Sequence, residues 1–565
     1  MRTKQKPYQF AGKLASSTAT DGRFIKVIWL LWVLILTVAL VIQLITLDVL
    51  PHLQQDEAQI TDYGRLALNP TSDWSVTWRL GEGKPLLLWS YLGPLIAEIS
   101  YQIGGTNGLG PRLASLIGGM IAATIAFGWL LARRVPIYVA FCLSLAFMLD
   151  PLFVLSQRMA RVDSWVVALC LASCWLLRVT LAKDGDSLNK WRFIAAGGLA
   201  AAAALVWPSA VFLYPLIVLE FFQSGEAENA EVGKVKLFAS KALYFGFGGV
   251  AMFILLLLPV WQNLVIIFSD MSTMVSQNID SSKTLSERLF SLFDPQVWLK
   301  LIKALVKTFT PLFPLLAIAG IIVHREKGLI LASFITLTMI FASLVYEFRV
   351  LYLIPYFVAL SSGIFVYLKE SVKSNRWLKK VSILALGVVT LWSVGTSLLV
   401  RTVLGLEGKT ERDRNKIYHV AASSIGPGNY KVFLGFTYEF YFVGRSLGWQ
   451  LYTPYIQFSY DSEGNWIREN DYQPKDKFHK LLSQMDFAVF AEGSVDEELS
   501  KDLAVSGLKY SGSLRVGEEQ GSTESPQLRE RNKEVFLWFL QGRMSYGPYV
   551  LYAREKSDKI SLNSE

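Results

Sequence analysis

The chain has 565 residues, of which 52% are hydrophobic and 18% are charged, whereas soluble globular proteins carry about 25% charged residues. This composition excludes an ordinary soluble protein and indicates a chain that lies mostly in lipid. The net charge of +9 does not predict a nucleic-acid partner, because the lysines and arginines gather in short loops between apolar runs, as they do in the cytoplasmic loops of membrane proteins.

Residues 1–26 form a basic segment without periodicity, which predicts a cytoplasmic tail. The apolar run 27–47 follows and is long enough to cross a bilayer. Because positively charged flanks stay in the cytoplasm, this first span delivers the next segment, with the acidic pair Asp56-Glu57, to the extracytoplasmic side.

The loop that follows, residues 50–111, contains the apolar stretch Leu86–Ile103. If this stretch crossed the membrane, Arg133 and Arg134 would fall outside, against the usual charge bias. Polar residues also dilute it, so we expect a juxtamembrane helix that lies along the surface. Pro85 suits the first position of that helix, which would place Lys84 beside a helix N-terminus where an anion is favoured.

Further apolar runs predict a polytopic α-helical membrane domain over residues 27–401, with about eleven crossings. The runs after the first lie near 112–132, 136–156, 164–181, 193–207, 209–222, 242–265, 300–323, 328–346, 350–368 and 381–401. With this topology Asp56, Lys84, Asp163 and Arg349 all fall on the extracytoplasmic face. Charges at membrane depth are costly unless they pair or line a wet cavity, so we expect a shared cavity there.

Residues 402–565 have the composition of a soluble domain and are predicted to be extracytoplasmic. Segments 431–436, 486–491 and 549–554 are typical of short strands, and 475–484 and 495–506 of amphipathic helices. Residues 516–526 are typical of a loop. The sequence therefore predicts a C-terminal extracytoplasmic α/β domain.

Each candidate site residue also has a structural interpretation. Asp56 and Glu57 would suit the first turn of a helix, where carboxylates complement unpaired N–H groups. Lys84 would suit the membrane interface as a snorkelling lysine. An ion pair between Arg161 and Asp163 would close a tight outer loop.

Two more arginines are candidate ligands of a lipid phosphate. Arg349 begins a later span and would bind a phosphate in bidentate fashion. Alternatively, it is a flanking arginine of that span. Arg158 lies in the same outer loop as Arg161, and both are further candidates for a phosphate contact.

In this order and on one face, these stretches resemble the polyprenyl-phosphate-sugar-dependent integral-membrane glycosyltransferases of the C type (GT-C). The resemblance is strongest to the branch that contains aminoarabinose–lipid A transferase and the protein O-mannosyltransferases. It extends from about Leu50 to Pro355, and its most specific elements are the spacing of Asp56-Glu57 from Lys84-Pro85, then Arg112 and Asp163.

The resemblance implies a function and a location. It implies an inverting transfer of a sugar from a polyprenyl-phosphate donor to an extracytoplasmic hydroxyl of a lipid, glycan or protein of the cell envelope. The enzyme would lie among the lipids of the cytoplasmic membrane. Asp56 would be the catalytic carboxylate, with Glu57 beside it, Lys84 a donor-phosphate ligand and Asp163 a second acid.

The chain departs from the family at two places. Relatives that bind a metal have an acid directly before the lysine, but here that position is Gly83, and Glu82 stands one residue earlier as the only candidate for a metal ligand. A Thr-Lys pair that often ends the fifth span is replaced by Val206-Trp207.

Two other classes of protein fit the spans and charges. A transporter or lipid flippase with an accessory domain is the main alternative. The sequence lacks the paired broken segments that such folds often have, and its charges gather at the edges of the spans. A membrane-anchored binding or assembly protein, in which the C-terminal domain carries the function, is the second alternative.

Overall fold

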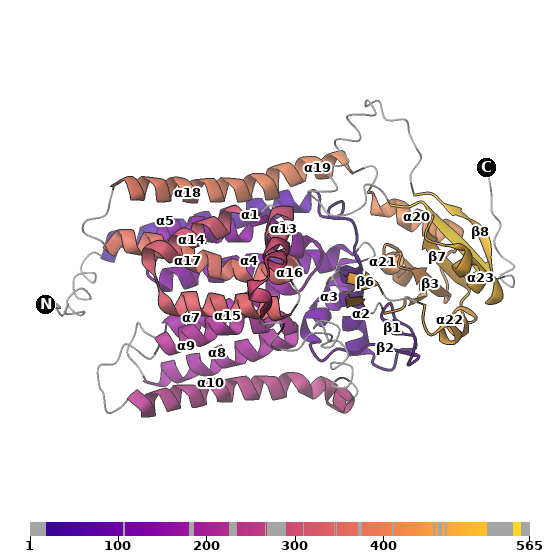
Figure 1. Cartoon of the computed structure of the whole chain (residues 1–565), viewed down its shortest axis with the longest axis horizontal. Helices are drawn as coiled ribbons and strands as arrows, with labels where there is room; N and C mark the ends of the chain where they lie inside the picture. The colour runs from indigo at the N-terminus through magenta and orange to yellow at the C-terminus, as the bar shows by residue number, and fades with distance from the viewer. Residues whose placement is uncertain are drawn as a thin grey trace. The chain divides into compact units, whose positions relative to one another are not determined.

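The computed structural model describes residues 18–105, 108–179, 186–224, 234–265, 267, 287, 290–308, 310–343, 345, 347–370, 376–409, 412–455, 458–460, 466–468, 472–516 and 546–554 (Figure 1). The chain divides into two compact units, residues 1–45 and 46–565. The first unit contains helix α1 (Thr18–Leu44), and its stretch Lys26–Leu44 is long and apolar enough to span a membrane, as the sequence predicted.

The second unit begins with a helical part that extends to residue 407. Its helices are α2 (Gln55–Leu68), α3 (Leu92–Gly104), α4 (Leu109–Ala132), α5 (Ile137–Met148), α6 (Pro151–Arg158), α7 (Asp163–Val179), α8 (Asp186–Val206), η1 (Pro208–Leu213), α9 (Tyr214–Gln223), α10 (Lys234–Leu257), η2 (Leu258–Asn263), η3 (Ser291–Phe293), α13 (Pro295–Lys307), α14 (Leu312–His324), α15 (Lys327–Ala342), α16 (Glu347–Val350), η4 (Leu351–Leu353), α17 (Ile354–Glu370), α18 (Arg376–Val394), the π-helical η5 (Gly395–Val400) and α19 (Arg401–Glu407).

Length and composition identify the helices that can span a membrane. Five such helices occur among the described residues, or six if α5 and α6, which meet at a 48° bend, form one broken span. Three shorter apolar helices, 208–223, 312–324 and 327–342, accompany them. The polytopic helical architecture is therefore present, while the total of eleven crossings stays a prediction.

Two predicted helices differ from those in the structure. The juxtamembrane helix begins at Leu92 and not at Leu86, because the segment before it is extended and Leu86 N–H donates to the carbonyl of Thr77 (3.1 Å). The run 300–323 is divided into α13 and α14, since Pro311 and Pro314 lack the N–H groups that would continue one helix.

Glycines bring several helices into close contact. A Cβ atom placed on Gly197 of α8 would lie 1.9 Å from the carbonyl oxygen of Phe245, and one on Gly248 of α10 would lie 1.9 Å from that of Ile194. Helices α8 and α10 therefore pack backbone to backbone (Figure 1). Membrane helices use such small residues because close packing replaces the hydrophobic driving force that water provides elsewhere.

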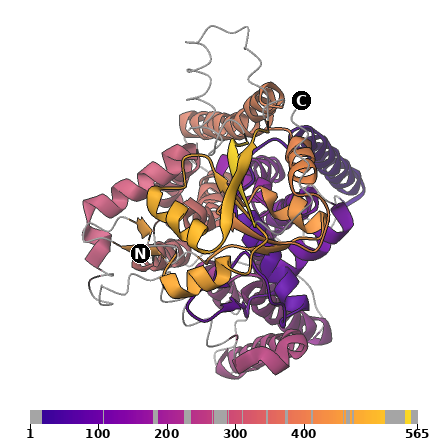
Figure 2. The ribbon, with the colours of Figure 1, turned by 90° about the vertical axis from the view of Figure 1, so that its right-hand side faces the viewer.

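Residues after 407 form a domain around a mixed sheet. Its elements are α20 (Arg414–Ser424), β3 (Lys431–Gly435), α21 (Phe440–Ser446), β4 (Gln450–Tyr452), β5 (Phe458–Tyr460), β6 (Trp466–Arg468), α22 (Lys475–Leu482), β7 (Phe487–Ala491), α23 (Glu497–Val505), β8 (Leu508–Leu514) and β9 (Tyr549–Arg554). The strand order is β4-β3-β7-β9-β8, with β3 parallel to β4 and β7, and β9 antiparallel to β7 and β8. Figure 2 looks onto this domain, drawn in orange and yellow.

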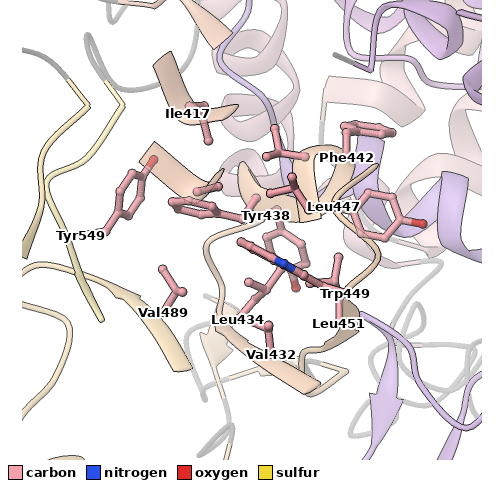
Figure 3. Packing of buried hydrophobic residues seen from close by; sticks show 14 of the residues in the cluster. Ile417, Val432, Leu434, Tyr438, Phe442, Leu447, Trp449, Leu451, Val489 and Tyr549 are labelled. Carbon is pink, nitrogen blue, oxygen red and sulfur yellow. The ribbon is translucent and has the colours of Figure 1, made fainter. Parts of the chain in front are cut away.

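The predicted strands 431–436, 486–491 and 549–554 coincide with β3, β7 and β9, and the two predicted helices with α22 and α23. Strands β4, β5, β6 and β8 and helices α20 and α21 were missed, and the predicted loop 516–526 lies almost wholly outside the described residues. Apolar side chains of the strands contribute to two buried clusters. The cluster that also includes residues of α20 and α21 (Figure 3) contains Leu434, Tyr438, Trp449, Val489 and Tyr549.

Candidate active site

Helix α2 places the acidic pair. Its capping box joins Gln54 and Glu57, and the Gln54 N–H donates to Glu57 Oε1 (3.3 Å). The two carboxylates then point to different environments. Glu57 is fully buried and accepts two hydrogen bonds from Arg112, at 2.7 Å (Nε) and 2.5 Å (Nη2).

Arg112 is the ion-pair partner that compensates the buried charge of Glu57. It also donates to the carbonyls of Leu47 (2.7 Å) and Pro51 (3.0 Å). The pair therefore fixes the start of α2 to the start of α4, and both oxygens of Glu57 are already hydrogen-bonded. We predicted Arg112 only as a family marker at the membrane interface.

Asp56 is the accessible member of the pair, since its side chain is 38% exposed. One of its oxygens, Oδ2, pairs with Arg161, and Oδ1 makes no hydrogen bond among the described residues. Arg161 also donates through Nε to Asp163 Oδ2 (2.7 Å), and its guanidinium lies 4.0 Å from the ring centroid of Phe348. The structure thus brings together three predicted site residues from distant parts of the sequence.

The second acid, Asp163, begins α7 and is 1% exposed. Tyr352 donates to its Oδ1 (2.6 Å), and Ser156 donates to Oδ2 (3.2 Å). The same Oδ2 also accepts the hydrogen bond from Arg161 Nε. Both oxygens of Asp163 are therefore occupied. We name the group Asp56, Arg161, Asp163 and Tyr352 the Asp56 cluster. Tyr352 carried no sequence signal, because a tyrosine within an apolar run is typical of a packed core.

Lys84 does not begin a helix, and that prediction was wrong. Lys84-Pro85 forms β2, which pairs with β1 (Trp78–Arg79) in a short antiparallel hairpin. The ammonium group lies 2.9 Å from Glu82 Oε2, and the side chain is 40% exposed. The hairpin therefore presents a partly hydrated cation that is held beside an acid and does not depend on a helix N-terminus.

An aromatic cluster joins the hairpin to α2. Tyr63 packs with Leu86 and Leu88, and Trp207 and Tyr455 lie against them. Burial raises the pKa of Tyr455 to about 12; the neighbouring Arg79 opposes this shift and Asp56 adds to it. Tyr455 of the C-terminal domain thus packs against Tyr63 of α2, and its N–H donates to the Trp78 carbonyl of the hairpin (2.8 Å), so it connects the hairpin with α2.

The other two predicted arginines differ in their surroundings. Arg349 lies in α16 next to Phe348, on which Arg161 stacks, and it is 7% exposed. Arg158 is 1% exposed and donates to the carbonyls of Leu50 (3.0 Å) and Thr46 (2.5 Å). Arg349 therefore directly follows the residue on which Arg161 of the Asp56 cluster stacks, while Arg158 holds the chain segment that follows the first span.

The surroundings of Glu82 do not suit a metal ion. Glu82, the only metal-ligand candidate of the sequence, pairs with both Arg79 and Lys84. Within the described ranges, no group of three or more His, Cys, Asp or Glu side chains lies close enough to hold an ion. Two cationic side chains beside a single carboxylate form salt bridges with it. They do not supply the several oxygen ligands that a divalent metal needs.

The C-terminal domain extends its sheet onto the hairpin. Trp78 N–H donates to the Thr453 carbonyl (2.9 Å), Tyr455 N–H to the Trp78 carbonyl (2.8 Å), and Thr453 N–H to the Ser75 carbonyl (3.2 Å). This ladder continues directly from β4. The hairpin that carries Lys84 is thus held by backbone hydrogen bonds of a domain nearly four hundred residues later in the chain.

Side chains strengthen the same contact. Arg445 of α21 donates to both oxygens of Glu98 in α3 (2.7 and 2.8 Å), and Tyr441 donates to Asp62 in α2 (3.1 Å). Asp62 is itself fully buried. The C-terminal domain is therefore part of the framework of the site, a role that the sequence left open.

Close packing of α2 on α3 allows a first prediction. A Cβ atom on Gly64 would lie 2.1 Å from the Pro94 carbonyl oxygen, so Gly64→Val should push α2 away from α3. We expect a loss of stability of about 1–3 kcal/mol, as for other overpacked positions, measured by thermal unfolding in detergent. Gly81→Val, where a Cβ meets nothing within 4 Å, is the control, and equal stabilities would contradict the packing.

No protein-family model matches the sequence, and no curated protein matches it. Solved structures do match. The crystal structure of ArnT from Cupriavidus metallidurans bound to undecaprenyl phosphate has a TM-score of 0.55 at 14% identity, over 93% of this chain and 98% of that chain. Arabinofuranosyltransferase AftD from Mycobacteria has a TM-score of 0.46 at 14% identity, over 92% and 39%. The Saccharomyces cerevisiae Pmt1–Pmt2 protein O-mannosyltransferase complex has a TM-score of 0.32 at 13% identity, over 41% and 34%.

The similarity to ArnT covers nearly the whole of both chains and is high enough to establish a common fold. This chain has the GT-C fold of an integral membrane protein, so the resemblance predicted from the sequence is confirmed at the level of the fold. At 14% identity the similarity does not extend to substrates.

Proposed function

We propose that this chain, built on the fold of the C-type glycosyltransferases, moves a sugar from a polyprenyl-phosphate donor to an acceptor hydroxyl on the extracytoplasmic side of the membrane. The observation that supports this most is the arrangement of Asp56. One carboxylate oxygen is held by Arg161, and the other makes no hydrogen bond among the described residues. A general base requires this combination of fixed orientation and access to substrate.

The roles of the neighbouring acids follow from their burial. Asp163 and Glu57 are almost fully buried and hydrogen-bonded through both oxygens. They are positioning residues: Asp163 holds Arg161, and Glu57 fixes the start of α2. Of these three acids, we assign contact with the acceptor to Asp56, because its side chain is the exposed one.

The proposed step is a single inverting displacement. The acceptor oxygen forms a bond to the anomeric carbon while the bond from that carbon to the phosphate oxygen breaks, and the hydroxyl proton moves to Asp56. Because the transition state resembles an oxocarbenium ion, the proton is transferred late and a carboxylate of ordinary basicity suffices. The leaving polyprenyl phosphate keeps the electron pair and needs charge neutralisation, which we assign to Lys84 and Arg349.

The direct test uses purified protein in nanodiscs with a panel of synthetic polyprenyl-phosphate sugars. Release of polyprenyl phosphate, measured by mass spectrometry, is the expected result for at least one donor. Movement of lipid-linked sugar across vesicles without cleavage of any donor would contradict the proposal and support the transporter or flippase alternative.

Replacement of Lys84 tests the donor site. Lys84→Ala removes one cation that would face the leaving phosphate, and such a charged contact is typically worth about 1.5–3 kcal/mol. We expect the KM for the donor to rise by about tenfold or more, with the KM for the acceptor nearly unchanged. The control is Lys477→Ala, which changes an exposed lysine of α22. If Lys84→Ala raised the KM for the donor and the KM for the acceptor equally, the assignment would be refuted.

A further inference from the structure

A second polar site lies at the other end of the helical bundle. Helix α4 carries Arg112 near its start and is followed by Arg133, and its 24 residues span about 36 Å at the usual rise per residue. Helix α7 begins with Asp163 and has Arg178 in its last turn. Helix α7 has 17 residues and spans about 26 Å. Both helices therefore run from the end of the bundle that holds Glu57 and Asp163 to a charged group at the other end, and α4 is longer than the hydrocarbon core of about 30 Å is thick.

The charged group at this far end is a closed network. Arg133 donates to Glu220 Oε1 (2.5 Å) and to Glu326 Oε2 (2.7 Å). Arg178 lies with Nε 2.9 Å from Glu220 Oε2 and donates through Nη2 to Gln223 (2.7 Å). Gln223 in turn donates to Glu326 Oε1 (3.0 Å). Two arginines therefore balance two carboxylates.

This network borders a cavity of about 310 Å³, which we call the distal cavity. Its lining includes Arg133, Arg178, Gln223, His324, Glu326 and Ser362. The space exists because α17 presents small residues there: the ring of His324 lies over Gly363, where a Cβ would come within 2.9 Å of it. Since a water molecule occupies about 30 Å³, the cavity is far larger than solvation of one polar atom requires.

The charges bordering the distal cavity restrict its ligand. Because Arg133 and Arg178 balance Glu220 and Glu326, a ligand of net negative charge would add uncompensated charge in a region of low dielectric. A zwitterionic ligand, with one anionic and one cationic group, would add no net charge. Arg178 and His324 offer N–H groups to an anionic part. Both oxygens of Glu326 already accept one hydrogen bond, from Gln223 and Arg133, but the side chain is 20% exposed and each oxygen can accept a second hydrogen bond from an ammonium group.

We infer that the distal cavity binds a zwitterionic phosphoethanolamine group, with the phosphate on Arg178 and His324 and the primary ammonium on Glu326. The cavity borders Arg133 at the end of α4, and a helix of about 36 Å that begins at one membrane interface ends in the headgroup layer of the other. A phospholipid of the leaflet opposite the Asp56 cluster would supply this group, and free phosphoethanolamine has the same chemistry.

The experiment uses the full-length protein, delipidated in detergent, and short-chain phospholipids of three headgroups. Binding is followed by native mass spectrometry and by thermal shift. Phosphatidylethanolamine should bind about tenfold more tightly than phosphatidylcholine, whose quaternary ammonium has no N–H to donate to Glu326. Phosphatidylglycerol, with its net negative charge, should bind similarly weakly. Equal binding of all three lipids would overturn the inference.

Two variants locate the binding. Val366 also lines the distal cavity. Val366→Trp fills the cavity and leaves every charge of the network in place, so it should abolish the preference for phosphatidylethanolamine while the protein stays folded. Glu326→Gln should remove the discrimination between ethanolamine and choline headgroups. The control, Arg134→Gln, changes an exposed arginine next to Arg133 and should have no effect.

Free phosphoethanolamine distinguishes the two sources of the ligand. If it binds as tightly as the phospholipid and with the same sensitivity to Val366→Trp, the ligand is a soluble compound. If only the phospholipid binds, the acyl chains contribute and the ligand is a membrane lipid. Unchanged binding of the phospholipid to Val366→Trp would place the ligand elsewhere and refute the site.

Discussion

Asp56→Asn should abolish sugar transfer and leave the protein folded. The amide cannot accept the acceptor proton, and loss of a general base typically lowers the rate by about 10²–10⁴-fold. Stability should change little, because the Asp56 side chain is 38% exposed and Arg161 keeps its hydrogen bond to Asp163. The measurement is kcat in nanodiscs, with the unfolding temperature of the same preparation.

A matched control separates charge from chemistry. Asp476 is exposed in the first turn of α22, as Asp56 is placed in the first turn of α2, so Asp476→Asn makes the same chemical change in the C-terminal domain. It should keep wild-type activity. A kcat for Asp56→Asn within a few-fold of wild type would remove the basis of the proposed mechanism.

Glu57→Gln should have the opposite profile, with a large loss of stability. It removes the carboxylate that pairs with Arg112, and both side chains are fully buried. Breaking a buried ion pair from one side leaves an uncompensated charge and typically costs about 3–5 kcal/mol. We expect this decrease in the free energy of unfolding, measured by denaturant titration in detergent.

The double variant Glu57→Gln with Arg112→Met provides the control. It removes the orphaned charge along with its partner, so its loss should be smaller than that of Glu57→Gln alone. If Glu57→Gln instead unfolds like the wild type but has no activity, Glu57 is the catalytic acid and the assignment to Asp56 must be revised.

The contrast between Asp56 and Glu57 shows what a sequence leaves open. Both residues suit the first turn of a helix, and nothing in the local sequence distinguishes them. Burial distinguishes them: Glu57 meets Arg112, fifty-five residues later, and Asp56 meets Arg161, more than a hundred residues later. The sequence predicted that this acidic pair mattered, but only these long-range partners separate a candidate base from an anchor.

Lys84 shows why a local motif is not sufficient. Proline after lysine is compatible with the first turn of a helix and equally with an extended hairpin. The hairpin forms because a distant backbone segment, residues 453–455, pairs with residues 75–78. No pattern around Lys84 contains that information, and the same holds for Tyr455, which the C-terminal domain brings against Tyr63 of α2.

The sequence by itself determined the membrane character of the chain, the position of many of its helices, three strands of the C-terminal sheet and the set of charges at the candidate site. These features depend on composition, on hydrophobic periodicity and on the cost of charge in lipid, all of which are local properties. The tertiary structure decided which carboxylate stays accessible, how Lys84 is presented and that the C-terminal domain supports the site. The physical reason is that burial and pairing are set by residues far apart in the chain, and these meet only when the helices and the sheet pack.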